Sequence, residues 1–354
     1  MNTMAFVRGL MGLAAMTAIT ASSPGALAHG GDEVERNPTD RGLASGRAEA
    51  AEEDRGAAAE GEERFTLSAD LVLGWGKAPF AVQNLPTTGT QAVTYSYAGA
   101  TPSDVQSFIF SGLVEVAKHV EIGARLPLSF ATFTPQGSSP EGAAARSTNS
   151  FGNIEIEAEY GSRVALSGAS TLNVVGILGV ALPTALGDEI PSDLAARNAS
   201  AVDVNAYDRF SLSRAASMAR GEEDSALFEP RRLGIVPKIA VSYRGPLLSI
   251  EPSLKVENLL STSSSLAAPY IGELVPALRV GYRATRVVEL DLRAWANVRF
   301  AAESGDRSTT AAVEPRIALR FGTVIPYAGI IIPVTGLAYS DSFLGIRLGV
   351  AGSF

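Results

Sequence analysis

The last twelve residues of the chain, 343–354, alternate between apolar and polar positions and end on an aromatic residue, Phe354. A period of two is that of a β-strand, and this pattern would place one face against lipid and the other against a polar lumen. An open sheet edge cannot lie in hydrocarbon, because its backbone groups would lack hydrogen-bond partners. The pattern therefore predicts a closed membrane barrel around this strand.

Eleven further segments alternate in the same way between turn residues. Helical spacing would scatter their apolar residues around a cylinder instead of along one face. Because bacterial single-chain barrels have even strand numbers, we expect an all-β fold, a transmembrane antiparallel up-and-down β-barrel of 12 strands, with 14 as the alternative. A thirteenth candidate strand, 201–213, conflicts with this parity. The expected strands are 65–75, 105–116, 120–130, 152–160, 171–182, 231–244, 247–259, 270–283, 287–300, 312–321, 324–334 and 343–354.

Connection lengths orient this barrel, since such proteins have short periplasmic turns and long external loops. Counted from a periplasmic N- and C-terminus, five short connections fall on the periplasmic side: 117–119, 161–162, 245–246, 284–286 and 322–323. The two counts agree only if residues 183–230 form one long external connection. This connection could act as a lid or fold inwards as a constriction.

Outward-facing aromatic residues give an independent test, because they should gather at the two membrane interfaces. On the lipid-facing parity, aromatic residues occur at both ends of the expected strands. The periplasmic set is Phe65, Tyr160, Tyr243, Tyr282, Phe321 and Phe354, and the external set is Trp75, Phe108, Phe110, Phe130, Tyr270 and Phe300. These two girdles indicate the outer membrane of a Gram-negative cell.

Two segments precede the expected barrel, which spans 64–354. Residues 1–28 read as a signal peptide, with Arg8 before a short apolar run and an A-x-A cleavage site at its end. Residues 29–63 hold eleven Asp or Glu against four Arg, whereas the whole chain has a net charge of −8. Because this stretch has few large apolar side chains, we expect a disordered acidic periplasmic arm, with a short polar helix as the alternative.

Charged residues on the opposite parity must point into the lumen, because Arg or Lys facing lipid at mid-membrane would cost about 2–4 kcal/mol each. Carboxylates gather at 155–159 and arginines between 279 and 347. Opposed charges could form a selective constriction, whereas the alternative is cross-strand ion pairing that only fills the interior. The candidate constriction residues are Glu121, Arg125, Glu155, Glu157, Glu159, Arg279, Arg293, Arg299, Arg316, Arg320 and Arg347. The other inward charges are Glu115, Lys238, Arg244, Glu251, Lys255, Arg283, Glu289, Asp291 and Glu314.

Two expected strands are apolar on both parities, and their inward residues would form an apolar strip. The strip consists of Val175, Ile177, Ala181, Ile325, Tyr327 and Ile331. It could contact a hydrophobic solute or pack against a loop or arm folded inside. A barrel of 12 strands lies between the filled 8-stranded and the open 16-stranded type, so a narrow or partly plugged path is expected.

The sequence offers little support for an enzyme. It has no cysteine, and its two histidines, His29 and His119, fall in the arm and in a periplasmic turn. No zinc-ligand spacing, phosphate loop or basic patch for nucleic acid is present, and no cofactor is expected. We therefore expect neither catalytic nor metal-binding residues.

Three short motifs between residues 114 and 184 resemble an outer-membrane transporter-like family labelled MetA-pathway of phenol degradation. They are Ala124-Arg125-Leu126-Pro127-Leu128, then Phe151-Gly152-Asn153-Ile154-Glu155-Ile156 with Tyr160, and Gly179-Val180-Ala181-Leu182-Pro183-Thr184. The family typically has Gly-Asp in place of Gly152-Asn153 and Pro-Thr-Gly where this chain has Pro183-Thr184-Ala185. The resemblance implies an outer-membrane barrel that passes small, often aromatic or hydrophobic, molecules.

These observations favour an outer-membrane channel that passes small solutes, hydrophobic or aromatic ones among them, by passive diffusion through a charge-lined lumen. The alternatives are a non-conducting outer-membrane barrel that presents external loops for adhesion or assembly, and a secreted soluble β protein. The expected partners are outer-membrane lipid, a small-molecule solute and the barrel-assembly machinery, whose recognition signal Phe354 resembles.

Overall fold

A computed structural model of the protein describes residues 65–84, 94–133, 146–166, 170–189, 204–264, 266, 268–301, 309–336 and 343–354. The expected signal peptide, 1–28, and the expected acidic arm, 29–63, lie outside the described residues.

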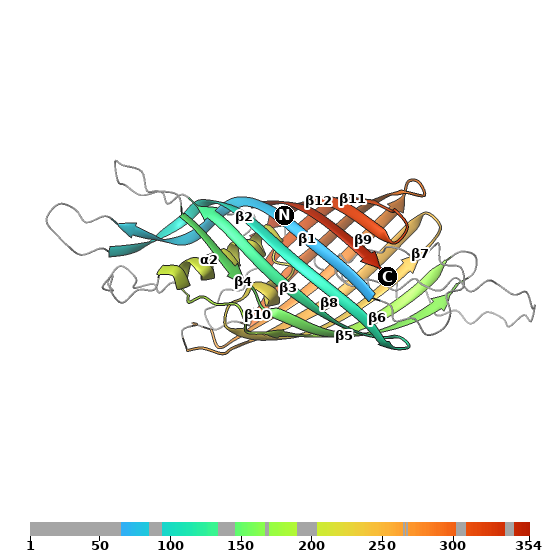
Figure 1. The fold of residues 1–354 in the computed structure, drawn as a ribbon, viewed down its shortest axis with the longest axis horizontal. Coiled ribbons are helices and arrows are strands. Elements are labelled where there is room, and N and C mark those ends of the chain that lie inside the picture. The colour runs from blue at the N-terminus through green and yellow to red at the C-terminus, as the bar shows by residue number, and fades with distance from the viewer. Residues whose placement is uncertain are drawn as a thin grey trace, which may run out of the picture.

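The described chain is built mainly of strands that run obliquely around a barrel (Figure 1). The first six are β1 (Phe65–Asn84), β2 (Thr94–Ala117), β3 (Val120–Phe133), β4 (Arg146–Phe151), β5 (Ile154–Ala165) and β6 (Thr171–Leu182). The helices α2 (Val204–Ala219) and α3 (Ser225–Phe228) follow. The remaining strands are β7 (Arg232–Arg244), β8 (Leu248–Ser261), β9 (Tyr270–Arg283), β10 (Val288–Ala301), β11 (Thr309–Leu319), β12 (Val324–Thr335) and β13 (Leu344–Ser353).

The sheet closes on itself, because β1 pairs with β2 on one side and with β13 on the other. β3 pairs with both β4 and β5, so these two are halves of one barrel strand that is interrupted at Gly152 and Asn153. All of the described pairings are antiparallel. Each of them links barrel strands that follow one another in the chain, except the pair β1–β13, which closes the barrel. The protein is therefore a closed, antiparallel, 12-stranded barrel, which confirms the predicted fold class.

The predicted strands all occur, with shifted ends. The largest shift is at the first hairpin, where β1 and β2 pair as far as Asn84 and Thr94 and extend beyond the rest of the barrel (Figure 1). The candidate strand 201–213 is wrong, because residues 204–219 form helix α2. Ala, Leu, Met and Arg in this segment favour a helix, which satisfies its own backbone hydrogen bonds without a neighbouring strand.

The outer surface is apolar, as a lipid boundary requires. Leu, Ile, Val and aromatic side chains on the lipid-facing parity are exposed all around the barrel. Nine of the twelve predicted girdle residues are among them: Phe65, Trp75, Phe110, Phe130, Tyr160, Tyr282, Phe300, Phe321 and Phe354. Phe108, Tyr243 and Tyr270 are half-buried. Within the described residues, no helix is long and apolar enough to span a membrane.

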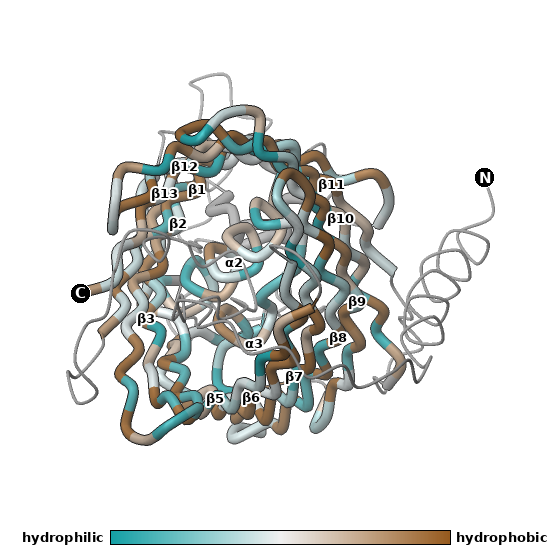
Figure 2. The backbone as a smooth tube through the Cα atoms, turned by 90° about the vertical axis from the view of Figure 1, so that its right-hand side faces the viewer, coloured by the Kyte–Doolittle hydropathy of each residue, from teal (hydrophilic) through white to brown (hydrophobic). Residues whose placement is uncertain are grey.

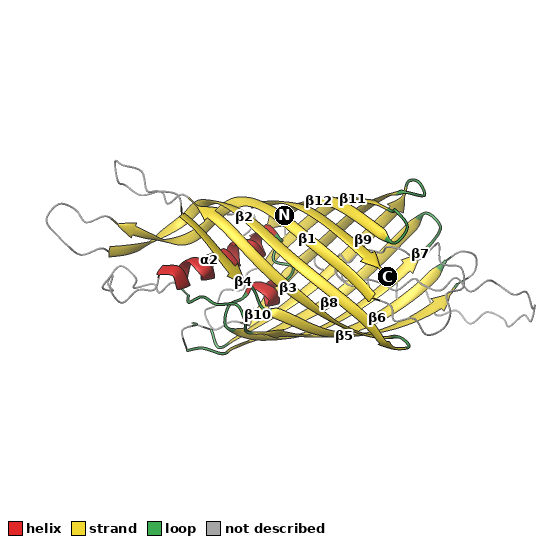
Figure 3. Ribbon diagram, in the orientation of Figure 1, coloured by secondary structure: helices red, strands yellow, loops and turns green. Residues whose placement is uncertain are grey.

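The two helices lie inside the ring of strands when the barrel is viewed along its length (Figure 2). The segment that contains them, residues 204–229, is called the plug below. α2 enters from the end that carries the long connections, and α3 lies beside the inner end of α2 (Figure 3). The predicted external connection 183–230 thus starts and ends at the external side, but its described helical part occupies the lumen.

Small apolar residues let the plug approach the wall closely. Leu212, Ala215 and Ala219 of α2 belong to one buried cluster with wall residues such as Val72 and Trp295. A Cβ atom on Gly74 of β1 would lie only 2.4 Å from the Ala219 Cβ, so the wall has no room for a side chain there. The core of this barrel is therefore the contact between plug and wall.

Candidate functional site

The tip of the plug, residues 220–224, reverses the chain at the end of α2. Gly221 and Glu222 have φ values of +67° and +55°. Their N–H groups donate to carbonyls of the last helical turn at 2.9 and 2.8 Å, which is the Schellman pattern of a helix end. A Cβ atom on Gly221 would lie 2.8 Å from the Trp295 ring, so glycine suits this position on both counts. The reversal presents the acidic residues that follow to the wall.

Glu223 pairs with two arginines of the wall. Both of its carboxylate oxygens accept hydrogen bonds from the Arg293 guanidinium of β10, with Arg293 Nη1 at 2.7 Å from Oε2. Arg347 Nη2 of β13 lies 3.6 Å from the same Oε2. Glu223 is only 2% exposed. This pair is bidentate and desolvated, so removing either partner alone would leave a buried charge without compensation.

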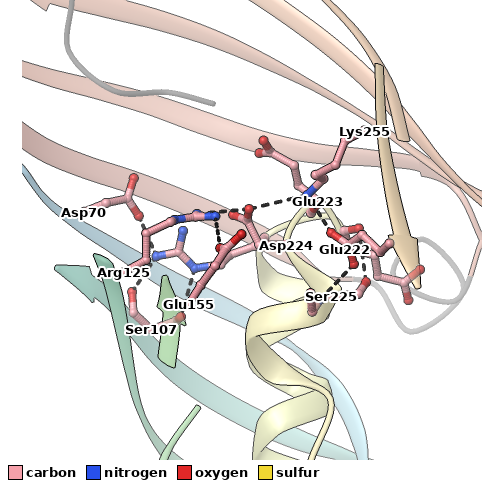
Figure 4. Close-up of polar contacts among 12 residues, drawn as sticks. Asp70, Ser107, Arg125, Glu155, Glu222, Glu223, Asp224, Ser225 and Lys255 are labelled. Atoms are coloured by element: carbon pink, nitrogen blue, oxygen red, sulfur yellow. Dashed lines mark hydrogen bonds and ion pairs between the residues drawn. The ribbon is translucent and has the colours of Figure 1, made fainter. Parts of the chain in front are cut away.

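Asp224 pairs with cations from β3 and β8 (Figure 4). Arg125 Nη2 lies 3.0 Å and Lys255 Nζ 3.6 Å from the Asp224 Oδ1 atom. Burial alone would raise the pKa of Asp224, but Arg125 and Lys255 outweigh this effect and hold the pKa well below its ordinary value. Lys255 also donates to the backbone carbonyl of Glu223. Adjacent residues of the tip are thus held by cations from four different strands.

Arg220 is the one cation of the tip, and it binds the wall at β1 and β2. Its Nη2 atom lies 2.5 Å from Asp70 Oδ1, and its Nε donates to the Ser107 hydroxyl at 2.9 Å. The other acid of the tip, Glu222, accepts a hydrogen bond from the Thr310 hydroxyl at 2.6 Å. Burial raises the pKa of Glu222, and this hydrogen bond opposes the rise.

The base of the plug is anchored at the interruption between β4 and β5. The Asn153 Nδ2 donates to the carbonyls of Ala226 and Glu229 at 2.9 and 2.7 Å, and its Oδ1 accepts from Ala185 N at 3.0 Å. The Asn153 N–H donates to the Leu227 carbonyl at 2.7 Å. One side chain therefore ties both ends of the described connection to the wall.

The residues around Asn153 come from all three family-like motifs. Gly152 N donates to the Pro127 carbonyl at 3.0 Å, and the Thr184 hydroxyl donates to the Gly152 carbonyl at 2.8 Å. A Cβ atom on Gly152 would lie 2.3 Å from the Leu227 carbonyl oxygen. The motifs, which are short and far apart in sequence, therefore have a common structural role in holding the plug.

The candidate constriction residues all point away from the lipid face, but they do not form one ring. Arg125, Arg293 and Arg347 bind the plug tip, and Glu155 joins them through a 3.0 Å contact with Arg125. Arg299 lies 3.4 Å from Glu229 at the plug base. Glu157 and Glu159 are buried, and Glu121 is half-buried opposite Glu159 in the ladder.

The remaining candidates form a second network, closer to the periplasmic turns. Arg279 and Arg316 both bind Asp291, at 2.9 and 3.1 Å, and Arg320 binds Glu289 at 2.5 Å. These contacts run across neighbouring strands and match the cross-strand pairing that was the alternative interpretation.

The acidic residues of the tip are functional candidates that the sequence interpretation missed. They lie in the connection 183–230, for which an inward fold was one of the expected possibilities, but none of its residues was assigned to the lumen. The available signal was the Glu222-Glu223-Asp224 triplet itself, in a connection between strands whose inward faces carry many arginines.

The apolar strip is partly covered by the plug. Ala181 packs against Ala226 of α3, and Ile331 belongs to the buried cluster of α2. Val175 and Ile177 cluster with Ala240 instead. The strip residues nearer the external end, Ala181 and Ile331, thus pack against an inward-folded segment. Such packing was one of the two possibilities that the sequence left open, the other being contact with a hydrophobic solute.

The plug leaves little free space beside its tip. A cavity of about 30 Å³, with room for no more than a few water molecules, is lined by tip residues together with Asp70, Arg125 and Tyr327. A smaller one of about 10 Å³ lies in the Arg279–Arg320 network. Neither is wide enough for a solute. Within the described residues, no group of acidic or histidine side chains is arranged to hold a metal ion.

Comparisons with known proteins give structural likenesses only. No protein-family model and no curated protein sequence matches the chain. The crystal structure of the COG4313 outer membrane channel from Pseudomonas putida F1 superposes with a TM-score of 0.50 at 11% identity, covering 84% of this chain and 97% of that one. The β domain of the Bordetella autotransporter BrkA gives 0.44 at 14%, over 83% and 100% of the two chains. OmpT of Vibrio cholerae gives 0.37 at 8%, over 82% and 97%.

At these identities the likeness concerns the fold alone. Together with the closed barrel and the apolar outer surface, it places the chain among the outer-membrane β-barrels.

Proposed function

We propose that this protein is an outer-membrane channel for small solutes, with a lumen that the plug closes in the conformation described here. The observation that carries the proposal is the chemistry of the contact at the plug tip. α2 packs on the wall through an apolar cluster, whereas the tip is held by ion pairs to Arg125, Arg293 and Arg347 that water can replace when the plug moves. Diffusion through the opened, charge-lined lumen needs no catalytic step and no cofactor.

The class of solute was expected to include hydrophobic or aromatic molecules. The resemblance of three motifs to the MetA-pathway family supports this expectation, but these motifs hold the plug. The apolar strip supports it less than its sequence indicated, because Ala181 and Ile331 pack against the plug. The proposal is therefore restricted to small solutes that pass a polar lumen.

Single-channel recording in planar bilayers tests the proposal. The wild-type protein is compared with a linker variant, in which a short Gly-Ser linker replaces residues 204–229. We expect rare, brief openings of the wild type and a steady conductance of the linker variant. Liposome swelling with small sugars should likewise be slower for the wild type than for the linker variant. A linker variant that folds and inserts but gives neither conductance nor swelling would contradict a channel function.

A non-conducting barrel for adhesion or assembly is the second candidate. The hairpin that continues β1 and β2 beyond the rim favours it, because residues past Trp75 pair only with each other and not with β13. Such an extension offers a surface outside the membrane (Figure 1). Deleting residues 79–100 should abolish adhesion or assembly. The same deletion made in the linker variant should leave its conductance unchanged.

A further inference from the structure

The plug tip occupies a cluster of wall cations that lie at one height of the lumen. Arg125, Lys255, Arg293 and Arg347 come from β3, β8, β10 and β13, and all four contact the two adjacent carboxylates of Glu223 and Asp224. Lys238 lies opposite Lys255 in the β7–β8 ladder, in the same part of the wall.

We infer that this cluster is a binding site for small organic carboxylates, and that Glu223 and Asp224 occupy it as a built-in substitute for such a solute. The inference rests on the proposed channel function and names its solute class.

The four cations differ in the carboxylates that the wall itself supplies to them. Arg125 and Lys255 each have one close wall partner, Glu155 at 3.0 Å and Glu257 at 2.6 Å, whereas Arg347 has two, Glu314 at 2.9 Å and Asp70 at 3.4 Å. Arg293 differs, because Glu223 is the sole carboxylate with which it pairs among the residues that the structure describes. When the tip leaves, Arg293 loses this pair, and the wall carboxylate opposite it in the β10–β11 ladder, Glu314, is already bound to Arg347.

The charges of the tip itself also affect the balance of charge at this height of the lumen. Residues 220–224 carry three carboxylates against the single guanidinium of Arg220, which pairs with Asp70. Withdrawal of the tip therefore makes this height of the lumen more positive. An unpaired cation in a narrow, partly desolvated lumen attracts an anion far more strongly than one in bulk water. A planar, bidentate guanidinium such as Arg293 matches a carboxylate in geometry as well as in charge.

The geometry favours a solute with two carboxylates over one with a single anionic group. Glu223 and Asp224 are neighbours in the chain and bind different cation pairs, Arg293 with Arg347 and Arg125 with Lys255. A short dicarboxylate could contact both pairs at once. Such a solute would compete with the tip and thereby favour the open state.

Succinate and its uncharged analogue succinamide test the competition on the full-length wild-type protein in planar bilayers. If succinate binds only the open state, the ratio of open to closed time rises about tenfold at ten times its Kd. Succinamide at the same concentration and osmolarity should leave the ratio unchanged. Equal effects of the two compounds on a conducting channel would overturn the inference and leave the channel function intact.

Substitutions can locate the binding site when they are made in a variant whose channel opens more often than that of the wild type. In full-length Glu223→Gln/Asp224→Asn, the plug tip is neutral, so succinate should block the chloride current in a saturable manner. Adding Arg293→Gln should weaken this block about tenfold or more, since a charge-assisted hydrogen bond contributes about 1.5–3 kcal/mol. Adding Arg163→Gln, which removes the same charge from the periplasmic end of β5, should leave it nearly unchanged.

The outcomes separate the two proposals. Equal weakening by Arg293→Gln and Arg163→Gln would show that only overall charge matters, and would overturn the binding site. Heat-modifiable migration on gels verifies that each variant has folded. If the folded wild type and the neutral-tip variant both fail to conduct in every solution, the channel function fails, and the inference fails with it.

Discussion

At the scale of single residues, the polar contacts of Asn153 and Arg293 hold the plug against the wall. Each side chain is the point at which a long connection meets the wall, and each satisfies groups that are otherwise buried without partners. A buried carbonyl that loses its donor costs free energy, whereas an exposed one turns to water. Substitutions at these sites should therefore act on the equilibrium between closed and open plug.

Asn153→Ala should open the channel more often without unfolding it. Three hydrogen bonds of its side chain tie Ala226, Glu229 and Ala185 to the wall, and at about 1 kcal/mol each their loss raises the open-to-closed ratio about a hundredfold. Single-channel recording measures this ratio. Asn149→Ala is the matched control, because Asn149 is exposed on β4 and should leave the ratio unchanged. Identical openings in the two variants would contradict the anchor.

At the scale of elements, the decisive feature is that the segment expected as an external connection is a helical plug. Its helix ends in a glycine-dependent reversal, and its base meets the interruption between β4 and β5. A helix fits the lumen because its backbone is satisfied internally, so only side chains need to match the wall. If the plug moves as a unit, fixing one residue of it should fix the channel closed.

A disulfide between the plug and β7 tests this movement in a chain that has no cysteine of its own. A Cβ atom on Gly234 would lie 3.5 Å from the Ala226 Cβ, within the range of disulfide geometry. Oxidised Ala226→Cys/Gly234→Cys should show no openings in planar bilayers, and reduction should restore them. The two single variants serve as controls. Openings that persist in the fully oxidised double variant would indicate that conduction does not require plug movement.

At the scale of the whole molecule, the closed barrel does not depend on the plug for its backbone hydrogen bonds. Among the described strands, all except β4, which pairs with β3 alone, have strand neighbours on both sides, and β1 and β13 complete the ring from Thr66 paired with Ser353 to Trp75 paired with Leu344. The plug supplies packing and charge compensation instead. Phe354 exchanges backbone hydrogen bonds with Phe65 at 2.9 and 3.0 Å, and its recognition by the barrel-assembly machinery stays a prediction.

The linker variant that lacks residues 204–229 should therefore fold but be less stable. We expect heat-modifiable migration like that of the wild type, because the wall ladder is intact. The temperature at which the fast-migrating form is lost should fall, since Trp295 and the wall arginines lose their buried partners. A variant without any heat-modifiable form would show that the barrel needs its plug to close.

The sequence alone determined the barrel, its strand number and its lipid face, because a lipid boundary imposes a period of two on the strands and all but two of the expected strands show it locally. It also placed the lumen charges on the inward parity, Arg125, Arg293 and Arg347 among them. Only the tertiary structure decided what fills the lumen. The contacts of the plug tip join residues far apart in the chain, such as Glu223 with Arg293, 70 positions apart, and Arg220 with Asp70, 150 positions apart, and no local pattern encodes them. A hydrophilic connection between strands has the same composition outside the membrane as inside a polar lumen, so its sequence did not distinguish the two.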